Sequence, residues 1–247
     1  MNKFKGKTVV ITGGNSGIGY ATAKEFKEQG ATVIITGRRK EAIQEAAQSL
    51  GITGIVADQS KVTDTEALAA QVSKEFGKVD ILFINAGVVT ASTIELATEA
   101  QYDNMMDINL RGAFFTLSKF IPHLADGASV VFLSSNTASM TRAGSSIYSA
   151  SKAALNSIMK TAAVELAPRN IRVNSVSPGP TETEIIDKMG FDEQTVKAIK
   201  EDLITKIPLH KIASAADIAS MVAYICGDAS SFITGSNIIM DGGMVLG

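Results

Sequence analysis

The sequence predicts a single α/β domain in which short buried strands alternate with amphipathic helices. Apolar runs of strand length recur along the chain, and between them apolar residues are spaced three or four apart, as on one face of a helix. The 247 residues are 45% hydrophobic and 19% charged, which is typical of a globular chain and common for one α/β domain. We therefore expect one domain covering residues 1–247.

The first expected strand, Thr8–Thr12, runs into a glycine-rich turn and then a helix through Phe26 to Gly30. Strand, glycine turn and helix together favour a phosphate site, because glycines allow a tight backbone and a helix N-terminus presents unpaired N–H groups. The alternative is a plain glycine-rich turn. The spacing Gly-x3-Gly-x-Gly indicates one branch of dinucleotide binders. The candidate cofactor contacts here are Gly13, Asn15, Ser16, Gly17, Ile18 and Gly19.

The second expected strand, Thr32–Thr36, ends in Gly37, Arg38 and Arg39. In dinucleotide folds an acidic residue near this place holds the ribose of NAD, whereas arginine accommodates the 2′-phosphate of NADP. The two arginines could instead be the solvated start of the charged helix Lys40–Leu50. Because no carboxylate follows the strand, the sequence favours NADP(H) as cofactor.

The third expected strand, Thr53–Val56, leads to the candidate cofactor contacts Asp58 and Gln59. The Asp58 carboxylate could bind the adenine amino group or cap a turn. The segment Thr63–Glu66 has the spacing of a capping box and predicts the start of a helix with Leu68, Val72 and Phe76 on one face.

The fourth expected strand, Asp80–Ile84, runs into Asn85, Ala86 and Gly87, whose small size would let the backbone lie close to a cofactor ring. A second capping box, Thr98–Gln101, predicts a long helix with Asn109 near its middle. The run 113–117 is too apolar for one side of this helix to face water. We expect the sheet to cover one side and a partner subunit the other.

The fifth expected strand, Ser129–Leu133, places Ser134 and Ser135 at the sheet edge where ligands bind in open parallel sheets. Tyr148 and Lys152 follow, one turn apart on the next predicted helix. A cation beside a phenol is expected to lower the pKa of the tyrosine and make it a usable proton donor or acceptor. The alternative reading of the pair is a packed ring and a solvated charge.

The sixth expected strand, Ile171–Val176, ends near Pro178, Gly179, Thr181 and Thr183. The irregular segment 184–207, with a helical patch near Val196–Leu203, is a candidate substrate lid. A capped helix starting at Ser214 and a seventh strand, Asn237–Met240, complete the pattern.

Composition argues against several other classes of protein. A net charge of −2 argues against nucleic-acid binding, and Lys3, Lys5 and Lys7 are interpreted as a solvated face. The single cysteine, Cys226, excludes an intrachain disulfide, and two distant histidines do not suggest a metal site. No apolar run reaches membrane-span length, and the first strand leaves no room for a signal peptide, so a cytoplasmic protein is expected.

In order along the chain, the motifs resemble those of the short-chain dehydrogenases/reductases over essentially the whole length. The resemblance rests on Thr12-Gly13-x3-Gly17-x-Gly19, Asn85-Ala86-Gly87, Asn109, Ser135, Tyr148-x3-Lys152 and Pro178-Gly179. It implies a Rossmann-type doubly wound sheet of seven parallel strands with helices on both faces. It also implies a homo-oligomer, with a tetramer favoured over a dimer.

The resemblance assigns roles to these residues. Tyr148 would be the general acid/base, Ser135 would polarise the carbonyl oxygen, and Lys152 would lower the pKa of Tyr148 and bond the nicotinamide ribose. Asn109 would hold a water that continues the proton relay. Pro178, Gly179, Thr181 and Thr183 would contact the cofactor.

The implied reaction interconverts a carbonyl compound and a secondary alcohol by hydride transfer with NADP(H). The alternatives are an NAD-dependent alcohol dehydrogenase of the same family and a non-catalytic regulator that senses NADP. The glycine turn lacks the basic residue that some NADP-using members carry there, so the NADP(H) prediction rests on Arg38 and Arg39. Arg142, between Ser135 and Tyr148, could bind an acidic substrate group or be a plain surface residue.

Overall fold

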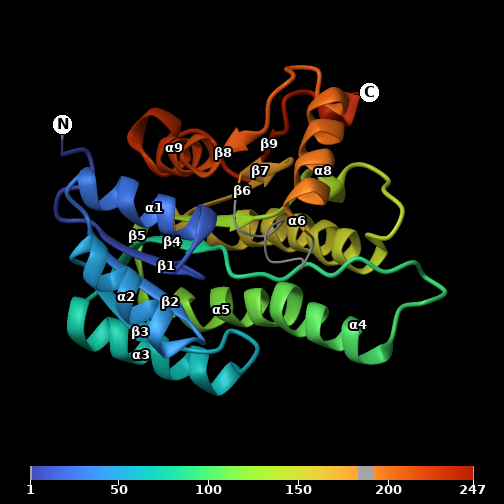
Figure 1. Cartoon of the computed structure of the whole chain (residues 1–247). Helices are drawn as coiled ribbons and strands as arrows, with labels where there is room; N and C mark the ends of the chain where they lie inside the picture. The colour runs from blue at the N-terminus through green and yellow to red at the C-terminus, as the bar shows by residue number, and fades with distance from the viewer. Residues whose placement is uncertain (1, 183–191, 247) are drawn as a thin grey trace.

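The computed structural model describes residues 2–182 and 192–246, and a parallel sheet with helices on both faces forms its centre (Figure 1). The seven strands lie in the order β3-β2-β1-β4-β5-β6-β9, and each neighbouring pair is parallel. Their bounds are β1 (Thr8–Thr12), β2 (Thr32–Gly37), β3 (Thr53–Val56), β4 (Val79–Ile84), β5 (Leu124–Leu133), β6 (Arg172–Pro178) and β9 (Asn237–Met240). This confirms the predicted fold class and its seven parallel strands.

Two groups of helices cover the two faces of the sheet. The helices α1 (Gly17–Glu28), α2 (Lys40–Leu50) and α9 (Ala215–Cys226) share one core with the sheet. The helices α3 (Val62–Phe76), α5 (Ala113–Phe120) and α6 (Ser146–Leu166) share the other. Figure 1 shows α1 and α9 on one side of the strands and α3 and α5 on the opposite side.

Burial on both faces explains why the strands are apolar throughout. In β1, Val9 and Ile11 point into the core beneath α1 and α9, whereas Val10 points into the core beneath α3 and α6. Successive side chains of a strand alternate between faces, so a strand covered on both sides needs apolar residues at every position.

The predicted long helix around Asn109 consists of three consecutive segments. They are α4 (Glu99–Met106), a π-helical turn (Asp107–Gly112) and α5 (Ala113–Phe120). A further helix, α8 (Glu193–Lys206), contains the predicted helical patch Val196–Leu203. The other predicted lid residues, 184–191, lie outside the described residues.

One of the two predicted capping boxes is present, and so is the helix cap predicted at Ser214. Thr98 and Ser214 each cap their helix, with Gln101 and Asp217 as the reciprocal partners. The capping box predicted at Thr63 is wrong, because α3 begins one residue earlier, at Val62, after Lys61 as N-cap residue. The acidic side chain in this first turn instead accepts a hydrogen bond from the loop that leads out of β3.

The predicted fifth strand is also too short, since β5 begins at Leu124 and not at Ser129. Leu124 pairs with Val79 before the register shifts and the regular ladder begins at Ser129. A short second sheet pairs β7 (Thr181–Glu182) with β8 (Ala213–Ser214) beside the end of β6. Of the helices formed by the described residues, none is long and apolar enough to cross a membrane.

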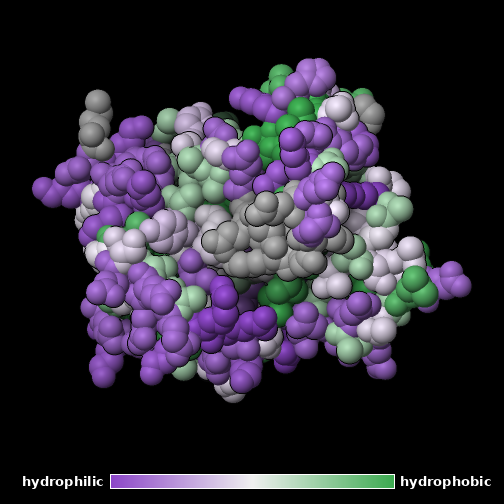
Figure 2. All heavy atoms as spheres, in the orientation of Figure 1, coloured by the Kyte–Doolittle hydropathy of each residue, from purple (hydrophilic) through white to green (hydrophobic). Residues whose placement is uncertain are grey.

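The surface is uneven in polarity. Hydrophilic side chains cover the region of α2 and α3, whereas hydrophobic ones gather at the far end of the segment between β4 and α4 (Figure 2). Ile94 and Leu96 in that segment are 81% and 72% exposed.

Candidate active site

A cleft of about 490 Å³ opens at the carboxyl ends of the central strands. The strand order reverses between β1 and β4, and in such sheets the crevice at the reversal is the usual ligand site. Residues at or just after the ends of β1, β2, β3, β4 and β5 line the cleft, together with one residue of the π-helical turn and two of α6. They are Thr12, Gly13, Asn15, Ser16, Gly17, Ile18, Gly19, Thr36, Gly37, Arg38, Arg39, Ala57, Asp58, Gln59, Asn85, Ala86, Gly87, Val88, Val89, Ile108, Leu133, Tyr148 and Lys152.

The glycine turn presents the N-terminus of α1 to this cleft. Gly13 has a φ of +68°, which favours glycine, and a Cβ at Gly19 would collide with the Gly13 carbonyl oxygen. The N-cap residue Ser16 makes no side-chain cap hydrogen bond to the first turn of α1. The first backbone N–H groups of this 12-residue helix are therefore not capped by Ser16, and the site fits a pyrophosphate.

The end of β2 contributes the two predicted arginines to the cleft wall. Arg38 and Arg39 are exposed there. None of the cleft-lining residues between β2 and Asp58 is acidic. The glycine turn lies close by, since a Cβ at Gly37 would come within 3.2 Å of Asn15 Oδ1. Two guanidinium groups beside a helix N-terminus suit a phosphate group.

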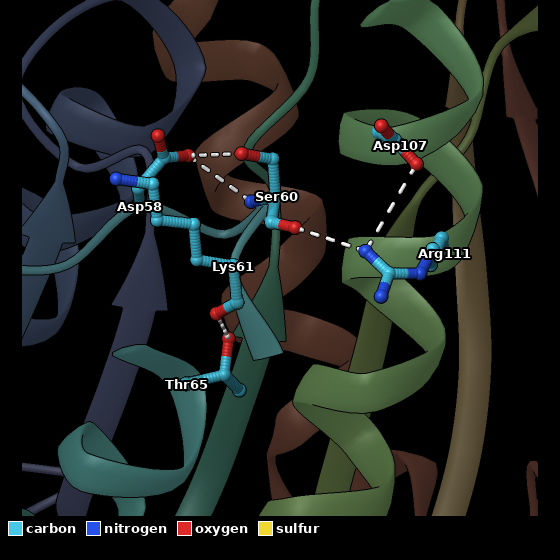
Figure 3. A network of polar contacts seen from close by, with 6 residues as sticks. All are labelled: Asp58, Ser60, Lys61, Thr65, Asp107 and Arg111. Carbon is cyan, nitrogen blue, oxygen red and sulfur yellow. Dashed lines mark hydrogen bonds and ion pairs between the residues drawn. The ribbon is translucent and has the colours of Figure 1, made fainter. Parts of the chain in front are cut away.

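The loop after β3 is held in a tight turn by its own side chains (Figure 3). Asp58 Oδ1 accepts hydrogen bonds from Ser60 N and Ser60 Oγ, at 3.1 and 2.8 Å. Arg111 Nη1, from the π-helical turn, donates to the Ser60 carbonyl at 3.2 Å (Figure 3). Asp58 therefore caps a turn at the wall of the cleft, which was one of its two predicted roles.

The turn after β4 is fastened to β1. Thr12 Oγ1 accepts hydrogen bonds from the backbone N–H groups of Asn85 and Ala86, both at 3.0 Å. The Asn85 side chain donates to the carbonyls of Thr12 and Gly13, at 2.8 and 3.0 Å. These contacts fix the backbone of both turns on either side of the strand-order reversal.

The predicted catalytic side chains meet at the end of β5. Ser135 is buried and forms a side-chain hydrogen bond with Tyr148. Lys152 is also buried, and its ammonium lies 5.7 Å from the centroid of the Tyr148 ring. Its Nζ donates to the Leu133 carbonyl at 2.7 Å, which directs it toward the strand end. Ser134, the other serine predicted at this sheet edge, donates instead to the Lys152 carbonyl.

The expectation that Lys152 lowers the pKa of Tyr148 is wrong for this structure. Burial raises the pKa of Tyr148 above its usual value of 10.0, and the hydrogen bond with Ser135 offsets this only in part. Burial also lowers the pKa of Lys152 from 10.5 to about 8. In both groups the loss of water disfavours the charged form, and the ammonium points at a carbonyl rather than at the phenol oxygen.

Asn109 lies behind the cleft, fully buried in the π-helical turn. Its Oδ1 accepts from Val88 N and its Nδ2 donates to Val88 O, both at 2.8 Å. A longer contact of 3.4 Å joins Nδ2 to Ser151 Oγ, which itself donates to the Tyr148 carbonyl. The amide thus ties the turn after β4 to the helix that carries Tyr148.

Pro178, Gly179 and Thr181 are not among the described residues that line the cleft. Gly179 N donates to the Met240 carbonyl, and Thr181 Oγ1 donates to the Gly179 carbonyl. Pro178 is the last residue of β6, and Thr183 lies outside the described residues. Sequence reasoning missed Ala57, Val89, Ile108 and Leu133, which line the cleft. Three of these adjoin predicted strand ends or site turns, and that position could have indicated them.

Comparisons with known proteins agree with this geometry. The family model described as "Enoyl-(Acyl carrier protein) reductase" matches residues 13–245. A Brucella melitensis structure titled a short-chain dehydrogenase/reductase, glucose/ribitol dehydrogenase, superposes with a TM-score of 0.92 at 34% identity and covers 98% of each chain.

Two further relatives name a cofactor. A short-chain dehydrogenase from Burkholderia cenocepacia, solved in complex with NADP, superposes with a TM-score of 0.89 at 31% identity, over 98% of this chain and 99% of its own. The NADP-dependent (R)-specific alcohol dehydrogenase of Lentilactobacillus kefiri is 32% identical over 251 residues, 98% of each chain. The chain belongs to the short-chain dehydrogenase/reductase family of oxidoreductases.

Proposed function

We propose that this protein is an NADP(H)-dependent oxidoreductase that interconverts a carbonyl compound and a secondary alcohol. The observation that carries the proposal is one cleft with two chemically distinct ends. Arg38 and Arg39 line one end beside the N-terminus of α1, and Tyr148 and Lys152 line the other. Such a cleft suits an anionic dinucleotide whose reactive ring lies beside a proton donor.

Several residues would hold the cofactor. The glycine turn, Gly13 to Gly19, would bind the pyrophosphate, and Arg38 and Arg39 the 2′-phosphate. Asp58 and Gln59 would border the adenine. Asn85, Ala86 and Gly87 would lie along the nicotinamide half, with Pro178, Gly179, Thr181 and Thr183 on its far side. Two relatives whose names or titles mention NADP support this choice of cofactor.

The side chains at the Tyr148 end of the cleft would transfer the proton. Bound NADPH supplies the hydride that the carbonyl carbon accepts. Ser135 would donate a hydrogen bond to the carbonyl oxygen, and Tyr148 would transfer its hydroxyl proton to that oxygen as the alcohol forms. The raised pKa of Tyr148 favours the protonated phenol at neutral pH, which suits reduction. Lys152 would bond the nicotinamide ribose.

The test is carbonyl-dependent oxidation of NADPH by the purified protein, assayed with a panel of ketones and aldehydes. Tyr148→Phe removes the proton donor and is expected to lower kcat by about 10²- to 10⁴-fold, with little change in the affinity for NADPH. Tyr224→Phe, on the exposed side of α9, is the matched control and should retain full activity. Full turnover by Tyr148→Phe would refute the assigned role. Acidic carbonyl compounds in the panel test whether exposed Arg142 selects substrates.

Two alternatives remain distinct from this proposal. An NAD-dependent alcohol dehydrogenase would bind NADH at least as tightly as NADPH, and Arg38→Ala would leave both affinities unchanged. For the proposed enzyme, Arg38→Ala should weaken NADPH binding by about tenfold or more and spare NADH, because it removes a charge-assisted phosphate contact. A regulator that only senses NADP would bind NADPH without turnover of any substrate in the panel.

The proposal includes a homo-oligomer, with a tetramer favoured, working in the cytoplasm. Phe114 and Tyr102 are 45% and 49% exposed on α5 and α4, where the sequence predicted a partner. Large apolar side chains left exposed on one face favour association with another surface. Sedimentation of the purified protein would decide among monomer, dimer and tetramer.

A further inference from the structure

The side-chain amide of Gln59 is buried and donates both of its hydrogens to backbone carbonyls. Nε2 lies 3.1 Å from the Ala86 oxygen and 3.0 Å from the Ile108 oxygen. Its Oε1 has no partner among the described residues. A flipped amide would place an oxygen against two carbonyl oxygens, so the contacts themselves fix the orientation. Both donors of the Gln59 side chain are therefore engaged in holding two backbone segments together.

The two carbonyls belong to the segments that Asn109 also joins. Ala86 lies in the turn after β4, two residues before Val88, and Ile108 directly precedes Asn109. Asn109 bonds both backbone groups of Val88 at 2.8 Å. The turn after β4 and the π-helical turn are thus fastened twice, by Gln59 on one side and by Asn109 on the other. Either amide alone would leave one side of the pair free to open.

The loop that carries Gln59 is itself pressed against the π-helical turn. A Cβ at Gly112 would collide with the Gln59 carbonyl oxygen, so only glycine allows this approach. Arg111 adds a hydrogen bond to the Ser60 carbonyl, and Asp58 closes the loop through Ser60 (Figure 3). The loop between β3 and α3 therefore lines the cleft with Asp58 and Gln59, and through the Gln59 amide it reaches the segments that Asn109 joins.

From these contacts we propose that Gln59 is a positioning residue. It sets the separation between the turn after β4 and the π-helical turn, and so holds the Asn109 amide in place beside Val88 and Ser151. It also links the wall proposed to border the adenine to the proton-transfer end of the cleft. The inference rests on the proposed function for its catalytic consequence, but not for its structural one.

The first test is a double-mutant cycle on turnover. Gln59→Met keeps the length of the side chain and removes both donors, so kcat for carbonyl reduction should fall about tenfold with the KM for the carbonyl changed less than about threefold. In an Asn109→Ala background, Gln59→Met should lower kcat by less than about twofold, because the amide that Gln59 holds in place is already absent. Equal losses in both backgrounds would refute positioning through Asn109.

A matched control separates stability from positioning. Thr65→Val removes a buried hydroxyl whose 3.3 Å bond to the Lys61 carbonyl lies just beyond the same loop (Figure 3). It should lower the free energy of unfolding without lowering kcat. A fall in kcat as large as that of Gln59→Met would mean that any loosening of the loop has the same effect, and would overturn the specific role of the amide.

The second test needs no activity. Hydrogen–deuterium exchange should be faster in Gln59→Met across residues 85–88 and 107–112, and unchanged in α9. Unchanged or uniformly faster exchange would refute the inference. If Gln59→Met does not fold, Gln59→Asn, whose amide is one methylene shorter, replaces it with the same expected direction. Absence of turnover in the unaltered protein would refute the proposed function alone, and the exchange result would still decide this one.

Discussion

Lys152 is expected to destabilise the folded protein at neutral pH. It is 3% exposed, and burial lowers its pKa from 10.5 to about 8. Below both values the ammonium is charged in the folded and the unfolded chain, so the folded chain bears the full cost of burying it. At about 1.4 kcal/mol for each pH unit between the two pKa values, that cost is about 3 kcal/mol.

Lys152→Met removes the charge and keeps most of the length of the side chain. It also leaves the Leu133 carbonyl without its donor, at a cost of about 1–3 kcal/mol that does not depend on pH. The diagnostic quantity is therefore the pH dependence of the difference between the two proteins. As pH rises through the window from about 8 to 10.5, the folded lysine loses its proton first, and the unaltered protein gains stability relative to the variant.

The assay is urea unfolding without cofactor, followed by circular dichroism at several values between pH 7 and 10. The difference in free energy of unfolding should shift by about 2–3 kcal/mol toward the unaltered protein over this range. Lys160→Met, an exposed lysine on the same helix, is the control and should stay within about 0.5 kcal/mol at each pH. A difference for Lys152→Met that is independent of pH would refute the reasoning.

Three further predictions concern separate features. Gly19→Ala should abolish NADPH binding or folding, since its Cβ would collide with the Gly13 carbonyl; normal binding by fluorescence titration would contradict this. Cys226, whose pKa burial raises to about 12, should react with a thiol reagent at pH 8 only after unfolding, and rapid reaction of the native protein would show that the thiol is accessible. Ser214→Ala should cost about 1 kcal/mol in urea unfolding, because it breaks the capping box with Asp217; an unchanged midpoint would count against the cap.

Strands and site turns could be predicted from the sequence because their signals are local. An apolar run such as Thr8–Thr12, followed by glycines, defines both a buried strand and the turn at its end. Since all the central strands are parallel, their carboxyl ends meet at one edge, and residues far apart in sequence converge there. For this reason the sequence alone could place Tyr148 and the glycine turn at one cleft.

Other features depend on contacts that periodicity does not record. Apolar spacing does not distinguish the π-helical turn from the α-helices around it, and the contacts that the buried amides of Asn109 and Gln59 make there come from distant parts of the chain. The pKa of Tyr148 depends on how much water reaches it, and burial raises it more than the hydrogen bond with Ser135 lowers it. The start of α3 was missed because the helix begins after Lys61, whose side chain makes no cap hydrogen bond, while Glu66 of the predicted box pairs with Lys119.

The neighbours β1 and β4 are separated in the chain by two complete strand–helix units. Their carboxyl ends nevertheless lie side by side and form opposite sides of the cleft. A fragment that contains only one of these two strands therefore cannot form the binding surface. Parallel pairing across such long connections is slow, because the chain must be ordered before the contact stabilises it. Recovery of dinucleotide binding after dilution from denaturant would therefore report the docking of these two strands and lag behind the recovery of helical signal.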